Sequence, residues 1–141
     1  MPETIDGLFD TAIERYKAGE PATDLIPVFK DLCDRAPKSS PAWTCLAWLY
    51  LLDDKAALAH KAAQKAVKLN PQDAQARVNL AVAMLETGQK GLREHVSFAQ
   101  QLIFVNPDWR EEIEQSMADG LQRKPGWESL QKVKNWILET N

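Results

Sequence analysis

The sequence contains few of the residues that catalysis and metal binding require. Among its 141 residues there are two histidines and two cysteines. His60 and His95 lie on separate predicted helices, and neither has a cysteine or carboxylate at a spacing typical of metal ligands. Cys33 and Cys45 form neither a metal-ligand spacing nor a disulfide framework, so we interpret them as small buried hydrophobic residues in a reducing compartment. The sequence therefore predicts a protein that is not an enzyme, with no cofactor and no metal site.

Signals for phosphate loops, export and membrane insertion are also missing. Gly88 and Gly91 flank a turn between predicted helices and follow no predicted strand, so they do not indicate a phosphate-binding loop. The first six residues are acidic and contain no apolar stretch, which argues against a secretory signal. The longest apolar run, at 42–52, is about half the length needed to cross a bilayer. We therefore expect a cytoplasmic protein with no transmembrane segment.

Acidic side chains slightly outnumber basic ones, but one segment carries basic side chains alone. The net charge is −3, which gives no general attraction for nucleic acid. Residues 1–54 carry ten acidic and five basic side chains, whereas residues 55–68 carry four lysines and no acidic side chain. A basic helix of this kind either forms a solvated outer face, with its lysines favoured near the helix C-terminus, or contacts phosphates and anionic lipid. The first interpretation is the more economical one.

A central stretch, residues 40–71, carries two helical stripes separated by a polar pair at 53–54. Its apolar, small and turn-forming residues are Trp43, Leu46, Ala47, Tyr50, Ala59, Ala63 and Pro71. Their spacing resembles the tetratricopeptide repeat, in which Trp-x2-Leu-Gly-x2-Tyr is followed by Ala-x3-Phe and Pro over about 34 residues. Ala47 replaces the usual glycine and Ala63 the usual phenylalanine, and both changes keep a residue that can pack between helices.

Moving this register by about 34 residues in either direction places similar residues on the same positions. The earlier copy contains Phe9, Ala12, Ile13, Tyr16, Leu25, Phe29 and Pro37, and the later copy contains Arg77, Leu80, Ala81 and Met84. We therefore predict three repeats, at about 6–39, 40–73 and 74–107. Because Pro27 would break a helix interior, we expect the second helix to begin near an Asp24 cap, with Pro27 in the first turn.

Beyond the third repeat the pattern decays into two further predicted helices. The segment 108–123 has apolar side chains at every fourth position, which are Trp109, Ile113, Met117 and Leu121, and Gly120 stands where the repeat has an aromatic residue. The segment 125–139 shows Trp127, Leu130, Val133 and Ile137 along one face. Terminal units of repeat arrays are commonly atypical, so we interpret these helices as a capping pair. The resemblance implies a single all-α domain, an α-solenoid of about eight helices wound into a right-handed superhelix.

The resemblance also implies a concave groove lined by the first helix of each pair. On the helix at 41–52, Trp48 lies about 200° from Leu46 around the axis, on the side away from the packing stripe. The equivalent rows predict a partner-binding groove lined by Asp10, Glu14, Lys17, Thr44, Trp48, Leu51, Val78, Val82 and Leu85. Two alternatives stay open. Either a partner helix or peptide fills this groove with Trp48 as its anchor, or the last helix folds back into it and makes Trp48 part of the core.

The function implied by the resemblance is non-catalytic protein–protein interaction, as an adaptor, an assembly factor or a co-chaperone-like scaffold. Binding of nucleic acid or an anionic surface through the basic helix 55–68 is the alternative. Members of this family that hold the C-terminal tails of heat-shock chaperones use a carboxylate clamp of lysine, asparagine and arginine side chains. The matching positions here are Asp10, Glu14, Cys45, Gln75 and Asn79. Acidic side chains in place of clamp residues repel a carboxylate, so we predict no clamp-type binding of an acidic C-terminal peptide.

Overall fold

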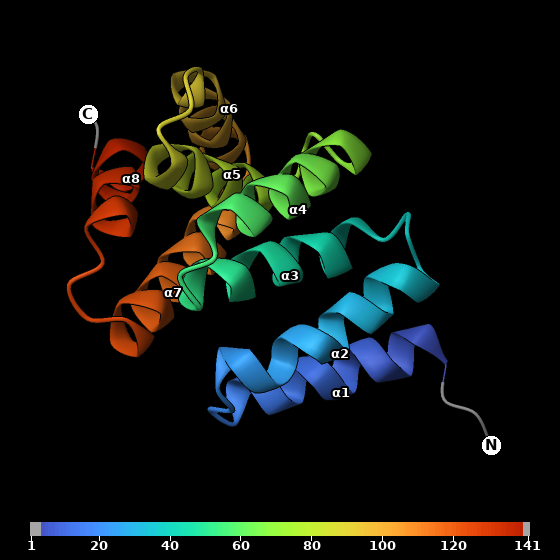
Figure 1. The fold of residues 1–141 in the computed structure, drawn as a ribbon. Helices are drawn as coiled ribbons and strands as arrows, with labels where there is room; N and C mark the ends of the chain where they lie inside the picture. The colour runs from blue at the N-terminus through green and yellow to red at the C-terminus, as the bar shows by residue number, and fades with distance from the viewer. Residues whose placement is uncertain (1–3, 140–141) are drawn as a thin grey trace.

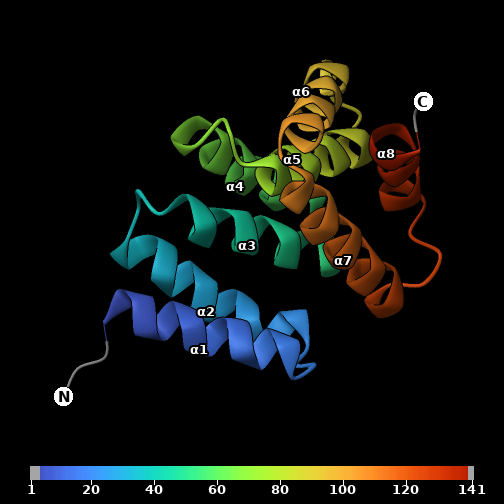
Figure 2. The same ribbon diagram turned by 180° about the vertical axis from the view of Figure 1, so that it is seen from behind.

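The computed structural model describes residues 4–139, and every regular element in that range is a helix (Figures 1 and 2). The eight helices are α1 (Ile5–Lys17), α2 (Ala22–Arg35), α3 (Ser40–Leu52), α4 (Ala56–Leu69), α5 (Ala74–Thr87), α6 (Leu92–Val105), α7 (Pro107–Arg123) and α8 (Glu128–Leu138). Several begin at side chains that accept a backbone N–H of the first turn, as Ser39 does for α3 and Asp73 for α5. The predicted all-α fold is confirmed.

The first six helices form three antiparallel pairs that stack in chain order (Figure 1). Small side chains let the helices of the central pair approach closely, because Ala47 of α3 and Ala59 and Ala63 of α4 are fully buried between them. Helix α4 ends at Leu69, just before Asn70-Pro71, because proline cannot continue a helix. Ala47 and Ala63, which replace the usual glycine and phenylalanine of the repeat, are both buried and so keep the packing role of those positions.

Helix α2 begins earlier than the sequence predicts. It starts at Ala22, so Pro27 lies in its second turn, and the predicted start near Asp24 is wrong. Pro27 has no N–H to donate to the carbonyl four residues earlier. The buried side chains of Ile26 and Phe29 lie on either side of it. Packing of this apolar face holds the helix across the missing hydrogen bond, because tertiary contacts supply most of a helix's stability.

Helices α7 and α8 leave the regular stack. Helix α7 runs diagonally across the molecule beside α3 (Figure 2), and α8 turns back to pack on α5 and α6. On α7, Ile113 and Met117 are fully buried, which confirms the predicted inward stripe. The residues predicted to form the inward face of the last segment are also buried; these are Trp127, Leu130, Val133 and Ile137. One continuous apolar cluster therefore joins the C-terminal helices to the three pairs.

Candidate functional site

The C-terminal segment covers part of the concave face, at Trp48. The Trp48 side chain is 8% exposed, and its ring lies tilted against the ring of Trp127, with 5.5 Å between centroids. Gly120 of α7 lies against the same ring, because a Cβ at that position would be 2.8 Å from two of its carbons. Helix α7 approaches α3 this closely because residue 120 has no side chain. Trp48 therefore belongs to the core, and α7 together with Trp127 fills this part of the groove.

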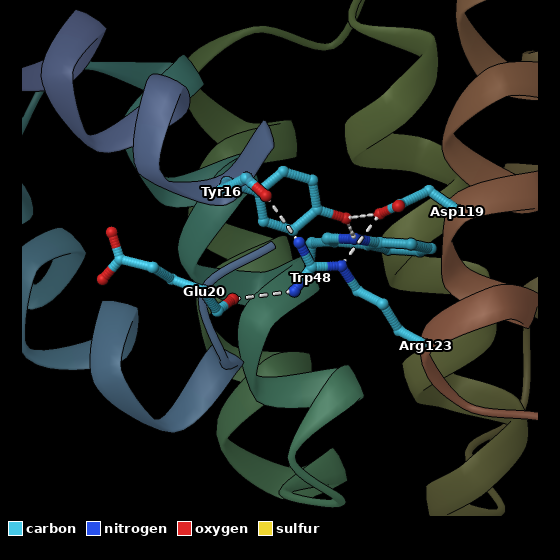
Figure 3. Close-up of polar contacts among 5 residues, drawn as sticks. All are labelled: Tyr16, Glu20, Trp48, Asp119 and Arg123. Atoms are coloured by element: carbon cyan, nitrogen blue, oxygen red, sulfur yellow. Dashed lines mark hydrogen bonds and ion pairs between the residues drawn. The ribbon is translucent and has the colours of Figure 1, made fainter. Parts of the chain in front are cut away.

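A polar cluster joins α7 to α1 at the same place (Figure 3). The indole Nε1 of Trp48 donates to the Tyr16 hydroxyl at 2.9 Å, and that hydroxyl donates to the carboxylate of Asp119. Arg123 forms an ion pair with Asp119 at 3.2 Å. It also donates to the backbone carbonyls of Tyr16 at 2.6 Å and Glu20 at 2.9 Å. We call the side chains of Tyr16, Trp48, Asp119 and Arg123 the Tyr16 cluster.

The charges and hydrogen bonds of the Tyr16 cluster favour the contact between α7 and α1. Burial, and then the hydrogen bond to Asp119, raise the pKa of Tyr16 well above its usual value, so the phenol stays neutral and can donate. The Arg123 guanidinium lies 4.0 Å above the Tyr16 ring and contacts carbonyls at the C-terminal end of α1, where a cation is favoured by the helix dipole. The cluster therefore holds α7 in place through charge-assisted hydrogen bonds.

Beyond the Tyr16 cluster the concave face stays open as a cleft of about 910 Å³. It is lined by Phe9, Ile13, Tyr16, Lys17, Phe29, Pro41, Thr44, Cys45, Trp48, Leu49, Gln75, Asn79, Glu112, Gln115, Ser116 and Asp119. The floor is largely apolar, with Phe9 and Phe29 in an edge-to-face contact at 5.9 Å. The wall from α7 is polar. A cleft of this size, with an apolar floor and a few polar groups, has the character of a ligand-binding site.

Polar groups at the α5 end of the cleft are already hydrogen-bonded to one another. Asn79 is fully buried, and its amide donates to the carbonyl of Thr44 at 3.0 Å and accepts from Gln75 at 2.8 Å. Burial raises the pKa of the neighbouring Asp73 carboxyl. Burial also raises the pKa of the Cys45 thiol to about 12, which keeps it protonated and unreactive at neutral pH. Hydrogen bonds among Gln75, Asn79 and Thr44 therefore hold the polar side chains at the α5 end of the cleft in place.

The structure brings together some of the residues predicted to line the groove. Lys17, Thr44 and Trp48 line the cleft, with Thr44 and Trp48 buried in its walls. Asp10 and Glu14 are exposed on α1 and are not among the lining residues. Partner binding by these residues stays a prediction.

The remaining predicted groove residues lie elsewhere. Leu51, Val78 and Val82 are fully buried, and Leu85 is half-buried. Helix α8 packs on α5, and it therefore covers a part of α5 that would face the groove in an open array. These side chains contribute to the core in this structure, and a role in binding stays a prediction for them as well.

Sequence reasoning missed the wall that α7 contributes to the cleft. This wall contains Glu112, Gln115, Ser116 and Asp119, which recur at helical spacing beside the buried stripe. The sequence contained one signal for it, the glycine at position 120 in the interior of a predicted helix. A glycine there weakens the helix, so it indicates close approach of another element.

Among residues 4–139, no group of three or more histidine, cysteine or acidic side chains is placed to hold a metal ion. No helix within the same residues has both the length and the apolar character needed to span a membrane.

Comparison with known proteins shows likeness in structure. No protein-family model matches the sequence, and no curated protein matches it. The Yersinia enterocolitica type III secretion chaperone SycD, solved with a peptide of the translocator YopD, has a TM-score of 0.70 at 18% identity, over 95% of each chain. MamA has a TM-score of 0.62 at 21% identity, over 98% of this chain and 78% of MamA.

The first tetratricopeptide-repeat domain of Spaghetti (RPAP3), bound to the HSP90 peptide SRMEEVD, is a further similar structure. Its TM-score is 0.56 at 16% identity, over 94% of this chain and 89% of that one. At these identities the likeness concerns the fold. The three helix pairs and this likeness together show that the chain has a tetratricopeptide-like helical-repeat fold.

Proposed function

We propose that this chain is a non-catalytic protein-interaction module that binds a peptide or helix of a partner protein in the cleft between α1, α3, α5 and α7. The observation that carries the proposal is the open cleft of about 910 Å³ with its apolar floor. Apolar side chains of a partner segment would pack on Phe9 and Ile13, and its backbone would lie beside the polar wall of Gln115 and Ser116. Two similar structures contain bound peptides, from YopD and from HSP90, which supports this use of the fold.

The biological role that fits such a module is that of an adaptor, an assembly factor or a co-chaperone for its partner. We place this role in the cytoplasm, because Cys33 and Cys45 are both free thiols that suit a reducing compartment.

The Tyr16 cluster supports the proposal in a second way, because it fixes the α7 wall against α1. A preorganised cleft loses less conformational entropy when it binds a peptide.

A pair of matched substitutions on α7 tests the site. Gln115 lines the cleft, whereas Gln122 is exposed on the same helix and does not line it. Peptides selected by phage display on the wild-type protein should bind Gln115→Trp at least about tenfold more weakly, because the indole occupies the cleft. They should bind Gln122→Trp as they bind the wild type. Fluorescence anisotropy of a labelled peptide measures both affinities, and circular dichroism checks that both variants fold.

Two results would contradict the proposal. One is that no peptide is enriched on the wild-type protein over a heat-denatured sample. The other is that the enriched peptides bind the two variants equally well, since their site would then lie outside this cleft.

A further inference from the structure

A second groove, separate from the cleft, is lined by basic side chains. It has a volume of about 550 Å³ and is lined by Lys61, Gln64, Lys65, Val67 and Lys68 of α4, Leu80 of α5 and His95 of α6. Among residues 4–139, it shares no lining residue with the cleft and is lined by no acidic side chain. At about 100° per residue, Lys61, Lys65 and Lys68 lie within about 60° of one another around α4. Helical spacing therefore directs three ammonium groups to one groove.

These cations have no anionic partner in the described part of the chain. The ion pairs found among residues 4–139 include none of Lys61, Lys65 and Lys68, and all three are exposed. A lysine that serves only to keep a helix face in contact with water does not need a second basic group beside it. Here, however, the opposite side of the groove carries another basic group, His95, rather than a carboxylate. An anion that enters the groove would therefore be attracted by all three ammonium groups and would meet no carboxylate among the lining residues.

An arginine reinforces the positive potential from behind. Arg77 is 7% exposed, and its guanidinium donates to the carbonyl of Pro71 at 3.1 Å and lies 4.0 Å from the centre of the Phe98 ring. It also lies 2.9 Å from Nδ1 of His95. Because a guanidinium can only donate, Nδ1 must accept this hydrogen bond, and neutral His95 carries its proton on Nε2. The buried Arg77 thus fixes His95 as a hydrogen-bond donor through Nε2.

Charged and titratable groups on α4, α5 and α6 act on His95. Burial lowers the pKa of His95 first, and the charges of Arg77 on α5 and His60 on α4 lower it further. Glu94 on α6 acts in the opposite direction. A bound anion would act in the same direction as the Glu94 carboxylate, so it should raise the pKa of His95. The pKa of His95 therefore reports whether an anion has bound in this groove. Lysines without a neighbouring histidine would give no such signal.

We propose that the groove between α4 and α6 binds a phosphate group, held by Lys61, Lys65 and Lys68 with Nε2 of His95. The ligand class is a phosphate-bearing anion, either free or as the headgroup of an anionic lipid. Nucleic acid fits less well, because three lysines contact few phosphates and the chain has a net charge of −3. This site stands independently of the peptide-binding proposal, because the two sites share no residue.

Titration with inorganic pyrophosphate tests the site, with the imidazole signals of His95 followed by NMR. We expect saturable binding that raises the pKa of His95 in the full-length protein. The double variant Lys61→Gln/Lys65→Gln should bind pyrophosphate at least about tenfold more weakly, because each lysine supplies a charge-assisted contact. The control, Lys30→Gln/Lys38→Gln, removes the same charge from exposed positions outside the groove and should bind as the wild type does.

A second arm distinguishes the two sources of the phosphate group. Vesicles of phosphatidylglycerol should compete with pyrophosphate if the natural ligand is a lipid headgroup, and vesicles of phosphatidylcholine should not. Competition supports a lipid source, and its absence with intact pyrophosphate binding supports a free anion. The proposal is overturned if pyrophosphate leaves His95 unchanged, if both double variants weaken binding equally, or if anionic vesicles bind while pyrophosphate does not.

Discussion

Gly120 determines how closely α7 approaches the core. A Cβ at this position would lie 2.8 Å from two ring carbons of Trp48 and 2.9 Å from a methyl carbon of Leu130. The Trp48 ring has little freedom to move, because it donates to Tyr16 on one side and packs against Trp127 on the other. Even one additional methyl group must therefore push α7 outward.

We expect Gly120→Ala to lower the free energy of unfolding. Overpacking a filled core costs about 1–3 kcal/mol, whereas alanine is favoured over glycine in a helix by about 0.5–1 kcal/mol. The net loss should be about 0–2.5 kcal/mol in urea denaturation. The control Gln122→Ala changes an exposed residue of the same helix and should be nearly neutral. A variant more stable than the wild type would show that position 120 is open to solvent.

Trp48 shows how far the sequence alone could reach at this scale. Helical geometry predicted that it lies on the side away from the packing stripe of its own repeat, and in the structure it contacts Tyr16, Gly120 and Trp127. Helical geometry could not decide whether a partner or the chain itself covers that side, because the periodicity of a helix identifies a face and not its neighbour. The close approach of Gly120 to Trp48 shows that the chain itself covers this side. In the sequence, Gly120 is only a departure from the repeat pattern.

At the scale of elements, Arg123 is the main connection between α7 and α1. Its side chain is 18% exposed and bonds to Asp119 and to two carbonyls of the first hairpin. Arg123→Ala leaves these acceptors without their charged donor, so we expect a loss of about 2–3 kcal/mol in unfolding free energy. Hydrogen exchange should quicken first in α7.

An exposed ion pair provides the control for Arg123. Arg35 pairs with Asp31 on α2, and both side chains are more than half exposed. Arg35→Ala should therefore change stability by no more than about 0.5–1 kcal/mol. Equal losses in the two variants would mean that the contact between α7 and α1 is no stronger than a surface ion pair.

Helix α8 completes the core instead of extending the array. Truncation after Lys124 removes the buried Trp127 that precedes this helix and the buried Leu130, Val133 and Ile137 within it. At about 1.5–3 kcal/mol for each, the loss approaches the total stability of a typical domain. We expect a much lower melting temperature or aggregation. A soluble monomer with an unchanged melting temperature would show that α8 is dispensable for folding.

The elements also show where sequence reasoning worked and where it failed. The helix pairs followed from the spacing of Trp43, Leu46 and Tyr50, because that spacing fixes which face of a helix is buried. The predicted start of α2 is wrong because it rests on the helix-breaking tendency of Pro27 alone. The buried side chains of Ile26 and Phe29 hold the helix across this proline. The path of α7 could not be predicted, because it depends on contacts between residues about a hundred positions apart, such as Tyr16 and Asp119.

At the scale of the whole molecule, the C-terminal helices convert an open array into one with a restricted site. A three-pair array would present a groove along α1, α3 and α5, whereas here α7 and α8 cover Trp48 and part of α5. What stays open is bounded by α7 on one side, and its wall contains the carboxylates of Glu112 and Asp119. The charge of this wall determines which peptides the proposed site would accept.

The peptide SRMEEVD, which is bound in the similar Spaghetti (RPAP3) structure, is a specific test of that charge. It is acidic and ends in a carboxylate. Of the described residues that line the cleft, one is a lysine, Lys17, whereas Glu112 and Asp119 are both acidic. Asn79 is fully buried, and its amide nitrogen already donates to the carbonyl of Thr44. Like charges about 4 Å apart repel by about 1 kcal/mol in water and by more beside a protein surface.

We therefore expect no measurable binding of SRMEEVD by isothermal titration calorimetry. Raising the ionic strength should not produce binding, because screening removes repulsion without supplying the missing cations. A peptide enriched on the wild-type protein serves as the positive control that the cleft is competent in the same sample. Saturable binding of SRMEEVD that disappears when its terminal carboxylate is amidated would show that a carboxylate clamp exists here, built from residues other than those at the family's positions.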